Sequence, residues 1–516
     1  MKEQINHWER RLSGEPPVKN GFTSKLERKV RERIHMQTKR KRLPIKAIAA
    51  TLGAVAVIGC GWLFRDDLQG LLQKNQPSDA LASIMEDPLA ESGGTLKAAI
   101  FPYGDFDEIR KPFIIRHPSV QIELATAPFN LEREAAKYVE WLEKEQPDLV
   151  MVPLNLFGQL AQEGKLKAID ALIKKDEFDL DQLHQPLVEL LRTAGGGELY
   201  GLPMEFASRA LFINKTLFAE KGITLPDPEG TMTLDDVLAL ASRFTGSGVQ
   251  GLTTDIRNAP YELVRLIGQT QGLQTVALEQ GKYVPMVQSD SWKQIWEKVA
   301  NGLAEGWIKL PGKMDFSKQV SMNEIMKNDL FAQGKAAMSL ADNTFYANLV
   351  SQEQRAKEGG KLDWMTVSYQ IDPAATNQIE YLSTPYVYAV TADSPNEKAA
   401  WELLKFIAGS ANAKRMDQSD RRNGRLLNRT SEMKSAAEDK WSGFYGMKVD
   451  PAKVVAEWTL RGDSRYLAAE RIIQSEGDQQ FRAVLEQQKS IDQALADLQT
   501  SLQASFAKLG KPGEGA

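Results

Sequence analysis

Residues 198–218, in the middle of the chain, read ELYGLPMEFASRALFINKTLF. This stretch passes through a Gly-Leu-Pro turn, enters an apolar run with a single arginine, and reaches Asn214-Lys215 before a new helix. The run ALFIN is wholly apolar up to Asn214 and reads as a strand. None of the catalytic motifs that carry a recognisable mechanism matches this stretch. The pattern indicates a connection that leads into a buried strand.

The chain on the N-terminal side of this stretch alternates between strands and helices. TLKAAIFP (95–102), VQIELATAP (120–128) and PDLVMVP (147–153) read as strands, and the last is almost wholly apolar. Helices are expected over 105–117 and 131–145, where apolar residues recur at helical spacing. Strands that alternate with helices predict a three-layer α/β body.

The C-terminal half continues this mixed pattern. Residues 231–334 are mostly helical, and a short strand is expected at 336–340. A strand and a long helix are expected within 384–410, with Ser394 or Asn396 as the N-cap. A final amphipathic helix begins after Ser490 and stops at Gly510. GSGVQG (246–251) matches a dinucleotide-binding pattern in form, but it follows a helix, so it is interpreted as a loop.

Charge is distributed unevenly along the 516 residues. Residues 1–46 hold 14 basic and 5 acidic side chains, whereas the remainder holds 50 basic and 63 acidic ones. An acidic body has no overall attraction to nucleic acid. Cys60 is the single cysteine, so an intramolecular disulfide is excluded.

Residues 44–64, PIKAIAATLGAVAVIGCGWLF, form the one long apolar run. Its uncharged part would extend about 27 Å as a helix, the thickness of a hydrocarbon core. Lys39 to Arg42 precede the run, so the positive-inside rule places residues 1–43 in the cytoplasm as a basic arm. The sequence predicts a transmembrane anchor at 44–64 and a tether at 65–94, with the body on the extracellular face of the cell membrane.

A lipoprotein signal is the alternative interpretation of the same run. VIGC (57–60) resembles a bacterial lipobox, in which Cys60 would receive the lipid after cleavage. A start at Met36 would give this signal an ordinary length. We expect the basic arm to bind a cytoplasmic or membrane partner, or anionic lipid.

Sequence motifs for catalysis are weak. The four histidines, His7, His35, His117 and His184, have no partner at metal-ligand or dyad spacing. There is no phosphate-binding P-loop and no Gly-x-Ser-x-Gly elbow. We expect neither a cofactor nor a metal, and no enzymatic activity; a pair of acidic residues that hydrolyses glycosides is a remaining alternative.

Four segments, taken in order, resemble one family. They are residues 147–170, the opening stretch, residues 331–346 (FAQGKAAMSLADNTFY) and residues 385–416 (PYVYAVTADSPNEKAAWELLKFIAGSANAKRM). Together they are similar to the bacterial extracellular solute-binding proteins of family 1, the sugar-type receptors of ABC importers. The resemblance covers roughly residues 95–510.

The resemblance implies a periplasmic-binding-protein-like fold of two α/β lobes with a hinge and a ligand cleft between them. The first lobe would comprise about 95–204 plus 382–415, and the second about 208–380 plus the C-terminal helices. Residues 204–210 would line the hinge, with ALFIN entering the second lobe. The ligand-binding residues expected from their positions are Tyr103, Asp105, Glu205, Arg209, Tyr261, Asp342, Asn343, Tyr346, Tyr386 and Arg425.

The function implied is capture of a small polar solute, a carbohydrate above all, by a membrane-tethered monomer that delivers it to an ABC permease. Many sugar receptors carry Gly-x-Trp after the Ala-Ala-Met strand, whereas this chain has SLADNTFY, so another polar solute stays possible. The alternative is a two-lobed sensor or scaffold that signals through its anchor to an inner partner.

Overall fold

The computed structural model describes residues 87–509 apart from 92, 103–105, 130, 132–134, 255–258, 313–319, 356–361, 376–377, 419–424, 430–437 and 462. The chain divides into two compact units, Met1–Ala80 and Leu81–Ala516, and every described residue lies in the second. The predicted arm, the predicted anchor and Cys60 therefore lie outside the described residues. Within the described part, no helix has both the length and the apolar character needed to cross a membrane.

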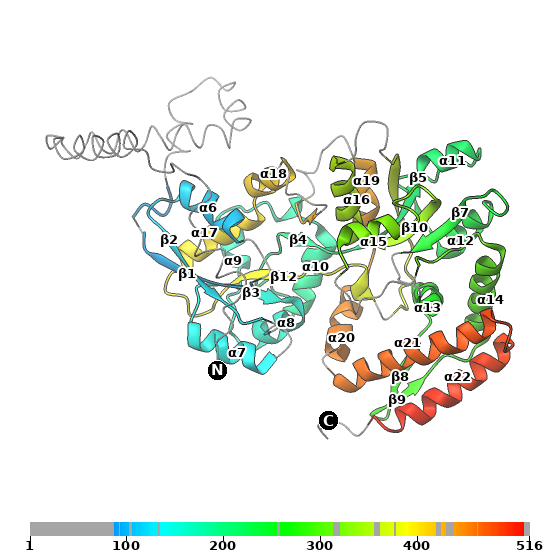
Figure 1. Ribbon diagram of the computed structural model, residues 1–516. Helices are drawn as coiled ribbons and strands as arrows, with labels where there is room; N and C mark the ends of the chain where they lie inside the picture. Colours follow the sequence, from blue (N-terminus) through cyan, green and yellow to red (C-terminus); the bar gives the residue numbers. More distant parts are fainter. Residues whose placement is uncertain are drawn as a thin grey trace, which may run out of the picture. The chain divides into compact units, whose positions relative to one another are not determined.

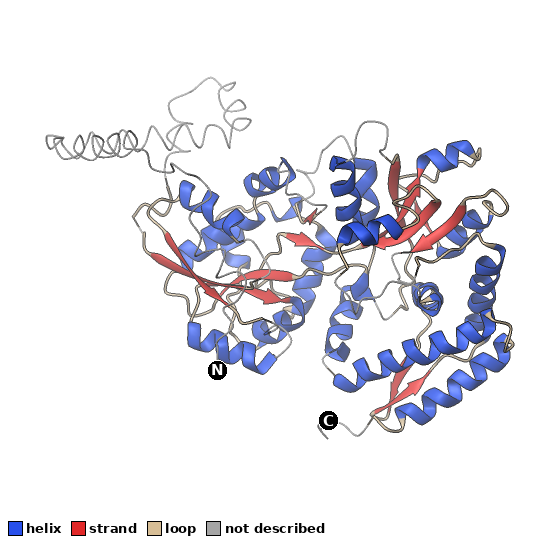
Figure 2. Cartoon of the chain, in the orientation of Figure 1, coloured by secondary structure: helices blue, strands red, loops and turns tan. Residues whose placement is uncertain are grey.

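The first of two main sheets has the strand order β12-β3-β1-β2. It contains β1 (Thr95–Ile100), β2 (Gln121–Thr126), β3 (Leu149–Pro153) and β12 (Tyr386–Val390). β1 runs parallel to β2 and β3, and β12 runs antiparallel to β3. We call this sheet and its helices the first lobe; the helices are α6 (Asp107–Arg116), α7 (Ala135–Glu145), α8 (Leu154–Gln162), α9 (Asp170–Lys175), α10 (Gln185–Ala194), α17 (Glu397–Ala408) and α18 (Ser410–Gln418). Figures 1 and 2 show helices on both faces of this sheet.

The second sheet has the order β6-β11-β5-β10-β7. Its strands are β5 (Arg209–Asn214), β6 (Thr231–Met232), β7 (Gln250–Thr254), β10 (Ala336–Asp342) and β11 (Trp364–Tyr369). β5 is antiparallel to β10 and β11, while β10 is parallel to β7. We call this sheet and its helices the second lobe; the helices include α11 (Lys215–Glu220), α12 (Leu234–Ser242), α13 (Pro260–Thr270), α14 (Asp290–Glu305), α15 (Met322–Asn328), α16 (Asn343–Arg355) and α19 (Glu438–Tyr445).

The apolar run of β5 has a direct explanation in this sheet. Successive side chains of a strand point to opposite faces. Ala210 and Phe212 pack with the core that includes α16 and α19, whereas Leu211 and Ile213 pack with α11, α12 and α13. Both faces of β5 are therefore covered. The strand predicted at 210–214 is confirmed, and it begins one residue earlier, at Arg209.

Three C-terminal helices follow α19 in the chain. They are α20 (Pro451–Arg461), α21 (Ser464–Leu485) and α22 (Ile491–Phe506), and α21 packs on α13, α14 and α22. Ser490 caps α22, since its hydroxyl accepts from the amide of Gln493, and this confirms the predicted start. The short hairpin of β8 (Val276–Glu279) and β9 (Lys282–Pro285) lies against α22.

The body begins before Thr95, where the sequence prediction had placed its start. Leu89 is fully buried, and the Asp87 carboxylate contacts His117 Nδ1 at the end of α6 at 2.6 Å. The Ser119 hydroxyl donates to the carbonyl of Leu89 at 3.0 Å. These contacts fix residues 87–89 to the first lobe, so this part of the predicted tether belongs to the folded body. The first four residues of GSGVQG (246–249) lie between α12 and β7, where Gly246 and Gly248 take positive φ values of 71° and 78° in a turn, as expected of a loop; Gln250 and Gly251 begin β7.

Candidate functional site

Three stretches of chain pass between the two lobes, and they lie beside one another. The first contains β4 (Glu205–Phe206), which pairs antiparallel with β13 (Leu426–Leu427) of the third stretch. Residues of the second stretch pair with the first, because Ala207 forms a bridge with Ser383. The Thr384 hydroxyl also donates to the carbonyl of Glu205 at 2.8 Å. Backbone pairing therefore ties the crossing segments together.

The helix α20 adds a further element to this junction. It packs against α10 of the first lobe and against the short helix η3 (Gln378–Glu380). Arg461, at its end, lies 3.7 Å from the carboxylate of Glu380. Arg461, at the end of α20, and Arg209, at the start of β5, line the same cavity.

A cavity of about 430 Å³ opens at this junction. Its walls come from the start of β5, from α13, η3, α20 and from the first half of α21. The lining residues are Arg209, Glu262, Arg265, Leu266, Gln269, Glu380, Arg461, Tyr466, Leu467, Glu470, Arg471 and Gln474. Four arginines and three glutamates among them make the surface strongly polar, and Tyr466 adds one aromatic ring. We call this space the charged cavity.

Arg265 is the central cation of the charged cavity. Its side chain is 9% exposed; Nη1 lies 3.0 Å from Glu262 Oε1, and Nη2 contacts Glu470 Oε2. Burial alone would lower the pKa of Arg265, but the carboxylates of Glu470 and Glu262 outweigh burial and raise it. Burial raises the pKa of Glu262, and the guanidinium of Arg265 opposes that rise. The three side chains form a partly buried network that joins α13 to α21.

Arg461 forms a second network at the same cavity. Its Nε and Nη2 lie 2.9 and 2.8 Å from Glu457 Oε1, and the Glu457 side chain is almost fully buried. Glu457 therefore holds Arg461 in place, although it does not itself line the cavity. Neutral hydroxyl groups suit such a surface, because they donate to carboxylates and accept from guanidinium groups.

A separate charged cluster lies where β4 meets β13. The Arg425 guanidinium is 3.4 Å from Glu205 Oε2 and 3.9 Å from Glu108 Oε2 on α6. Burial raises the pKa of Glu205; Arg425 opposes this shift and Glu108 adds to it. Side chains from α6, β4 and the residue before β13 thus converge at the crossing segments. Among the described residues, no group of three or more His, Cys, Asp or Glu side chains is placed to hold a metal ion.

Comparison with known proteins agrees with this architecture. The family model for the bacterial extracellular solute-binding proteins matches residues 142–414, more than half of the chain. The chain belongs to this family. A relative named as a binding protein, from Brucella abortus (strain 2308), is 23% identical over 321 residues, which make up 59% of this chain and 68% of the relative.

Solved structures show the fold of this solute-binding protein. A sugar transporter from Rhizobium etli, in an open conformation, has a TM-score of 0.55 and 17% identity, with 80% of this chain and 100% of the other covered. The sugar-binding protein MalE from Xanthomonas citri has a TM-score of 0.53 and 16% identity over 80% and 98%. The likeness establishes the two-lobed α/β fold of periplasmic binding proteins. The family and these neighbours are binding proteins.

Several residues expected to bind ligand lie at the junction in this solute-binding protein. Arg209 lines the charged cavity, and Glu205 and Arg425 form an ion pair. Tyr386 is partly exposed at the start of β12, where its ring stacks on Phe101 with 4.9 Å between centroids. Asp342 stands directly opposite Arg209 in the pairing of β10 with β5. Tyr103 and Asp105 lie outside the described residues.

The remaining three predicted residues have structural contacts instead. Asn343 holds the crossing segment, because its Oδ1 accepts from the amide of Ser208 at 3.2 Å and its own amide donates to the Ser208 carbonyl at 3.0 Å. Tyr261 is 1% exposed and packs edge-on against Trp296. Tyr346 is 4% exposed and packs against Trp364 and Phe444. Both tyrosine rings are enclosed by the core, and we do not retain them as ligand contacts.

Sequence reasoning missed most of the charged cavity. The residues concerned are Glu262, Arg265, Glu380, Arg461, Tyr466, Glu470 and Arg471. Glu262 and Arg265 stand three apart on α13, a spacing that brings two side chains together on one helix face. That spacing was a usable signal, but the partner Glu470 is more than 200 residues away in sequence, at a separation of 205. Position in the chain alone does not reveal such a contact.

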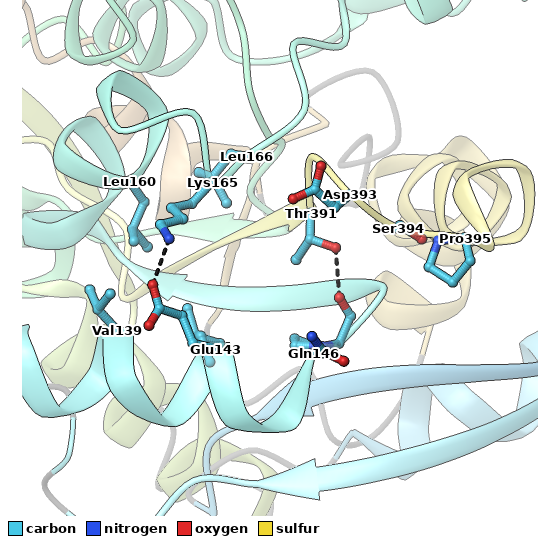
Figure 3. A pocket seen from close by; sticks show the side chains of 12 residues that line it. Val139, Glu143, Gln146, Leu160, Lys165, Leu166, Thr391, Asp393, Ser394 and Pro395 are labelled. Carbon is cyan, nitrogen blue, oxygen red and sulfur yellow. Dashed lines mark hydrogen bonds and ion pairs between the residues drawn. The ribbon is translucent and has the colours of Figure 1, made fainter.

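A larger cavity, of about 520 Å³, lies elsewhere in the first lobe (Figure 3). Val139, Leu160 and Leu166 line its apolar part, and Lys165 Nζ lies 2.6 Å from Glu143 Oε1 at its edge. The Thr391 hydroxyl donates to the Pro147 carbonyl at 2.6 Å, where β3 begins and β12 ends. Ligands of open α/β sheets bind at the carboxyl ends of the parallel strands, and this cavity lies at the opposite ends. Its larger volume alone does not make this cavity a better candidate for the ligand site than the charged cavity.

His184 connects the first lobe to the crossing segments. Its ring stacks on Phe206 of β4 with centroids 4.8 Å apart, and it meets Tyr445 of α19 edge-on at 5.3 Å. The side chain is buried, and burial lowers the pKa of His184 to about 4. In the unfolded chain an imidazole has a pKa of about 6.5. The folded protein therefore favours neutral His184.

Acidification from about pH 7 to about pH 5 is expected to cost about 2 kcal/mol of folding free energy through His184. The folded-state pKa lies below the unfolded one, so this stabilisation is complete above about pH 6.5 and is lost as the pH falls towards 4. Urea unfolding of the full-length protein at both pH values measures the loss. His184→Phe keeps an aromatic ring beside Phe206 and should lose about 2 kcal/mol less than the wild type. Equal losses in both proteins would contradict the assignment.

Proposed function

We propose that this chain captures an uncharged, hydroxyl-rich solute of the carbohydrate class and delivers it to an ABC permease, without converting it. The charged cavity at the crossing segments is the observation that supports this proposal. Its four guanidinium groups supply donors and its three carboxylate groups supply acceptors, which together suit hydroxyl groups. A ring such as Tyr466 offers an apolar face to the C–H side of a sugar. The family and the solved neighbours, several of them sugar-binding by name, favour the same solute class.

Closure of the lobes would complete the site. We take the first lobe as about 95–204 plus 382–415, and the second as about 208–380 plus the C-terminal helices. Tyr386, Glu205 and Arg425 would approach the solute from the first lobe and from the crossing segments. Phe129, which follows β2 and is 72% exposed, would add a further aromatic face. Closure by a hinge is a common response of two-lobed proteins to ligand.

A thermal-shift screen of the full-length protein tests the proposal. The panel contains neutral mono-, di- and trisaccharides and sugar alcohols, with uronic acids and amino acids as comparison sets. A solute present at 100 times its dissociation constant adds about 2.7 kcal/mol of stability and raises the melting temperature. We expect neutral sugars to give the shifts. Shifts with the acidic or amino-acid sets alone, or no shift with any sugar, would reject the carbohydrate assignment.

We further propose that residues 44–64 hold the body at the outer face of the membrane as a spanning helix. The apolar length and the preceding basic cluster, Lys39 to Arg42, support this. Cys60→Ser is then expected to leave the protein in the membrane fraction, and neither form should incorporate radiolabelled fatty acid. Lipid labelling of the wild type that disappears in Cys60→Ser would instead establish the lipoprotein alternative.

A further inference from the structure

An aromatic contact joins the first lobe to the second beside the crossing segments. His184 directly precedes α10 of the first lobe, whereas Trp441 and Tyr445 belong to α19 of the second. The ring of Tyr445 meets His184 edge-on at 5.3 Å between centroids, and it meets Trp441 edge-on at 5.1 Å. An imidazole of the first lobe and an indole of the second therefore touch the same tyrosine ring.

Both sides of this contact are bound to the third crossing stretch. The backbone amide of His184 donates to the carbonyl of Asn428 at 2.7 Å. The Tyr445 hydroxyl donates to the carbonyl of Leu427, also at 2.7 Å. Because Leu427 and Asn428 are adjacent in the chain, the two lobes are held by neighbouring carbonyls of one stretch. A rotation of the lobes about this stretch can turn His184 and α19 relative to each other and keep both hydrogen bonds.

The contact contains one unused hydrogen-bond donor and one unused acceptor. Trp441 is 7% exposed and His184 is 6% exposed, yet Nε1 of Trp441 and Nε2 of His184 have no hydrogen-bond partner among the described residues. An indole N–H can only donate, and a neutral imidazole accepts at one of its two ring nitrogens. The two unused groups are therefore complementary, and they come from opposite lobes.

Two buried indoles inside the lobes differ from Trp441, because they are paired. Trp401 Nε1 donates to a carboxylate within the first lobe at 2.8 Å, and Trp364 Nε1 donates to a carboxylate within the second at 2.6 Å. Trp458, which has no partner for its Nε1 in the described part of the chain, lies at the junction on α20. Most buried polar groups of folded proteins are paired, and an unpaired one costs free energy. A complementary unpaired donor and acceptor on opposite lobes therefore indicate a second arrangement of the lobes in which they meet.

We propose that lobe closure brings the indole N–H of Trp441 to Nε2 of His184, and that the hydrogen bond formed there favours the solute-bound arrangement. Trp441 and His184 are then positioning residues, which act on affinity through closure and without contact to the solute. A group that stabilises one of two arrangements shifts the population towards it, and so strengthens binding of whatever that arrangement holds. The inference rests on the proposed function, because the captured solute is what keeps the lobes closed.

A double-mutant cycle in solute affinity tests the inference with the full-length protein. Trp441→Phe and His184→Phe each keep an aromatic ring and remove one of the two groups. Calorimetry with the neutral sugar that gives the largest thermal shift should show a dissociation constant about fivefold higher in each variant, the effect of one lost hydrogen bond. The double variant should also be weaker by about fivefold, because both substitutions remove the same bond; independent effects would multiply to about 25-fold. Trp401→Phe is the matched control, since it loses the same ring volume and an indole N–H that is bonded within the first lobe.

The outcomes separate the inference from the proposed function. Trp401→Phe should lower the melting temperature and keep the wild-type dissociation constant. Unchanged affinity in Trp441→Phe, or effects that multiply in the double variant, would overturn the inference and leave sugar capture standing. Equal weakening of binding in Trp401→Phe would assign the effect to general destabilisation and overturn it as well. If no sugar binds the wild type, the proposed function fails and the inference falls with it.

Discussion

Replacement of Arg265 by alanine is expected to destabilise the protein by about 3–5 kcal/mol and to abolish solute binding. The side chain is 9% exposed and joins Glu262 on α13 to Glu470 on α21. Without the guanidinium, the partly buried carboxylates of Glu262 and Glu470 both lose their ion-pair partner. They must then take up protons or move apart, which changes the wall of the charged cavity.

Urea unfolding of the full-length protein, without added solute, measures this effect. Arg471→Ala is the matched control, since Arg471 is an exposed arginine on α21, next to Glu470, and lines the same cavity. It should change stability by less than about 0.5 kcal/mol. The triple variant Arg265→Met, Glu262→Gln, Glu470→Gln should recover much of the stability, because it removes the buried charges together, but not the binding. A loss below about 1 kcal/mol in Arg265→Ala would contradict the role assigned to the network.

The variant Gly477→Ala is expected to force α21 away from α13. A Cβ at this position would lie 2.0 Å from Tyr261 Cε1, far inside van der Waals contact. Tyr261 is 1% exposed and held by Trp296, so its ring has no space into which to turn. Overpacking of this kind costs about 1–3 kcal/mol. Because α21 carries Glu470 and Tyr466, its displacement should also weaken solute binding.

Thermal unfolding and solute calorimetry measure the two effects of Gly477→Ala. Gly94→Ala is the control, since a Cβ there would meet nothing within 4 Å. The control should keep both stability and affinity. Full affinity in Gly477→Ala would show that the spacing of α13 and α21 does not shape the site.

Local sequence patterns were sufficient for most of the fold. The apolar run in β5, the strand β3 and the Ser490 cap of α22 each follow from residues close together in the chain. The site was harder to predict, because it depends on contacts between distant segments. Arg265 on α13 meets Glu470 on α21, and no local pattern links them. Tyr261 shows the same difficulty, since it was chosen for its place after a polar loop, yet helix α13 turns its ring into the core.

The position of Glu205 and Arg209 at the crossing segments has a physical reason. Gly201-Leu202-Pro203 ends the chain's path in the first lobe, and β5 begins the second, so residues between them had to lie at the junction. This path of the chain is what placed Glu205 and Arg209 at the junction. Arg425, which pairs with Glu205, was placed in the same cleft by its loop position. Glu380 and Arg461, which line the charged cavity with Arg209, come from segments that the sequence did not identify as neighbours.

Isothermal titration of the full-length protein, with the neutral sugar that gives the largest thermal shift, tests the central claim most directly. We expect saturable binding of one solute molecule per chain, and recovery of that solute chemically unchanged by chromatography. We also expect Arg461→Ala to lose binding. Conversion of the solute, or binding that is undiminished in both Arg461→Ala and Arg209→Ala, would contradict capture in the charged cavity.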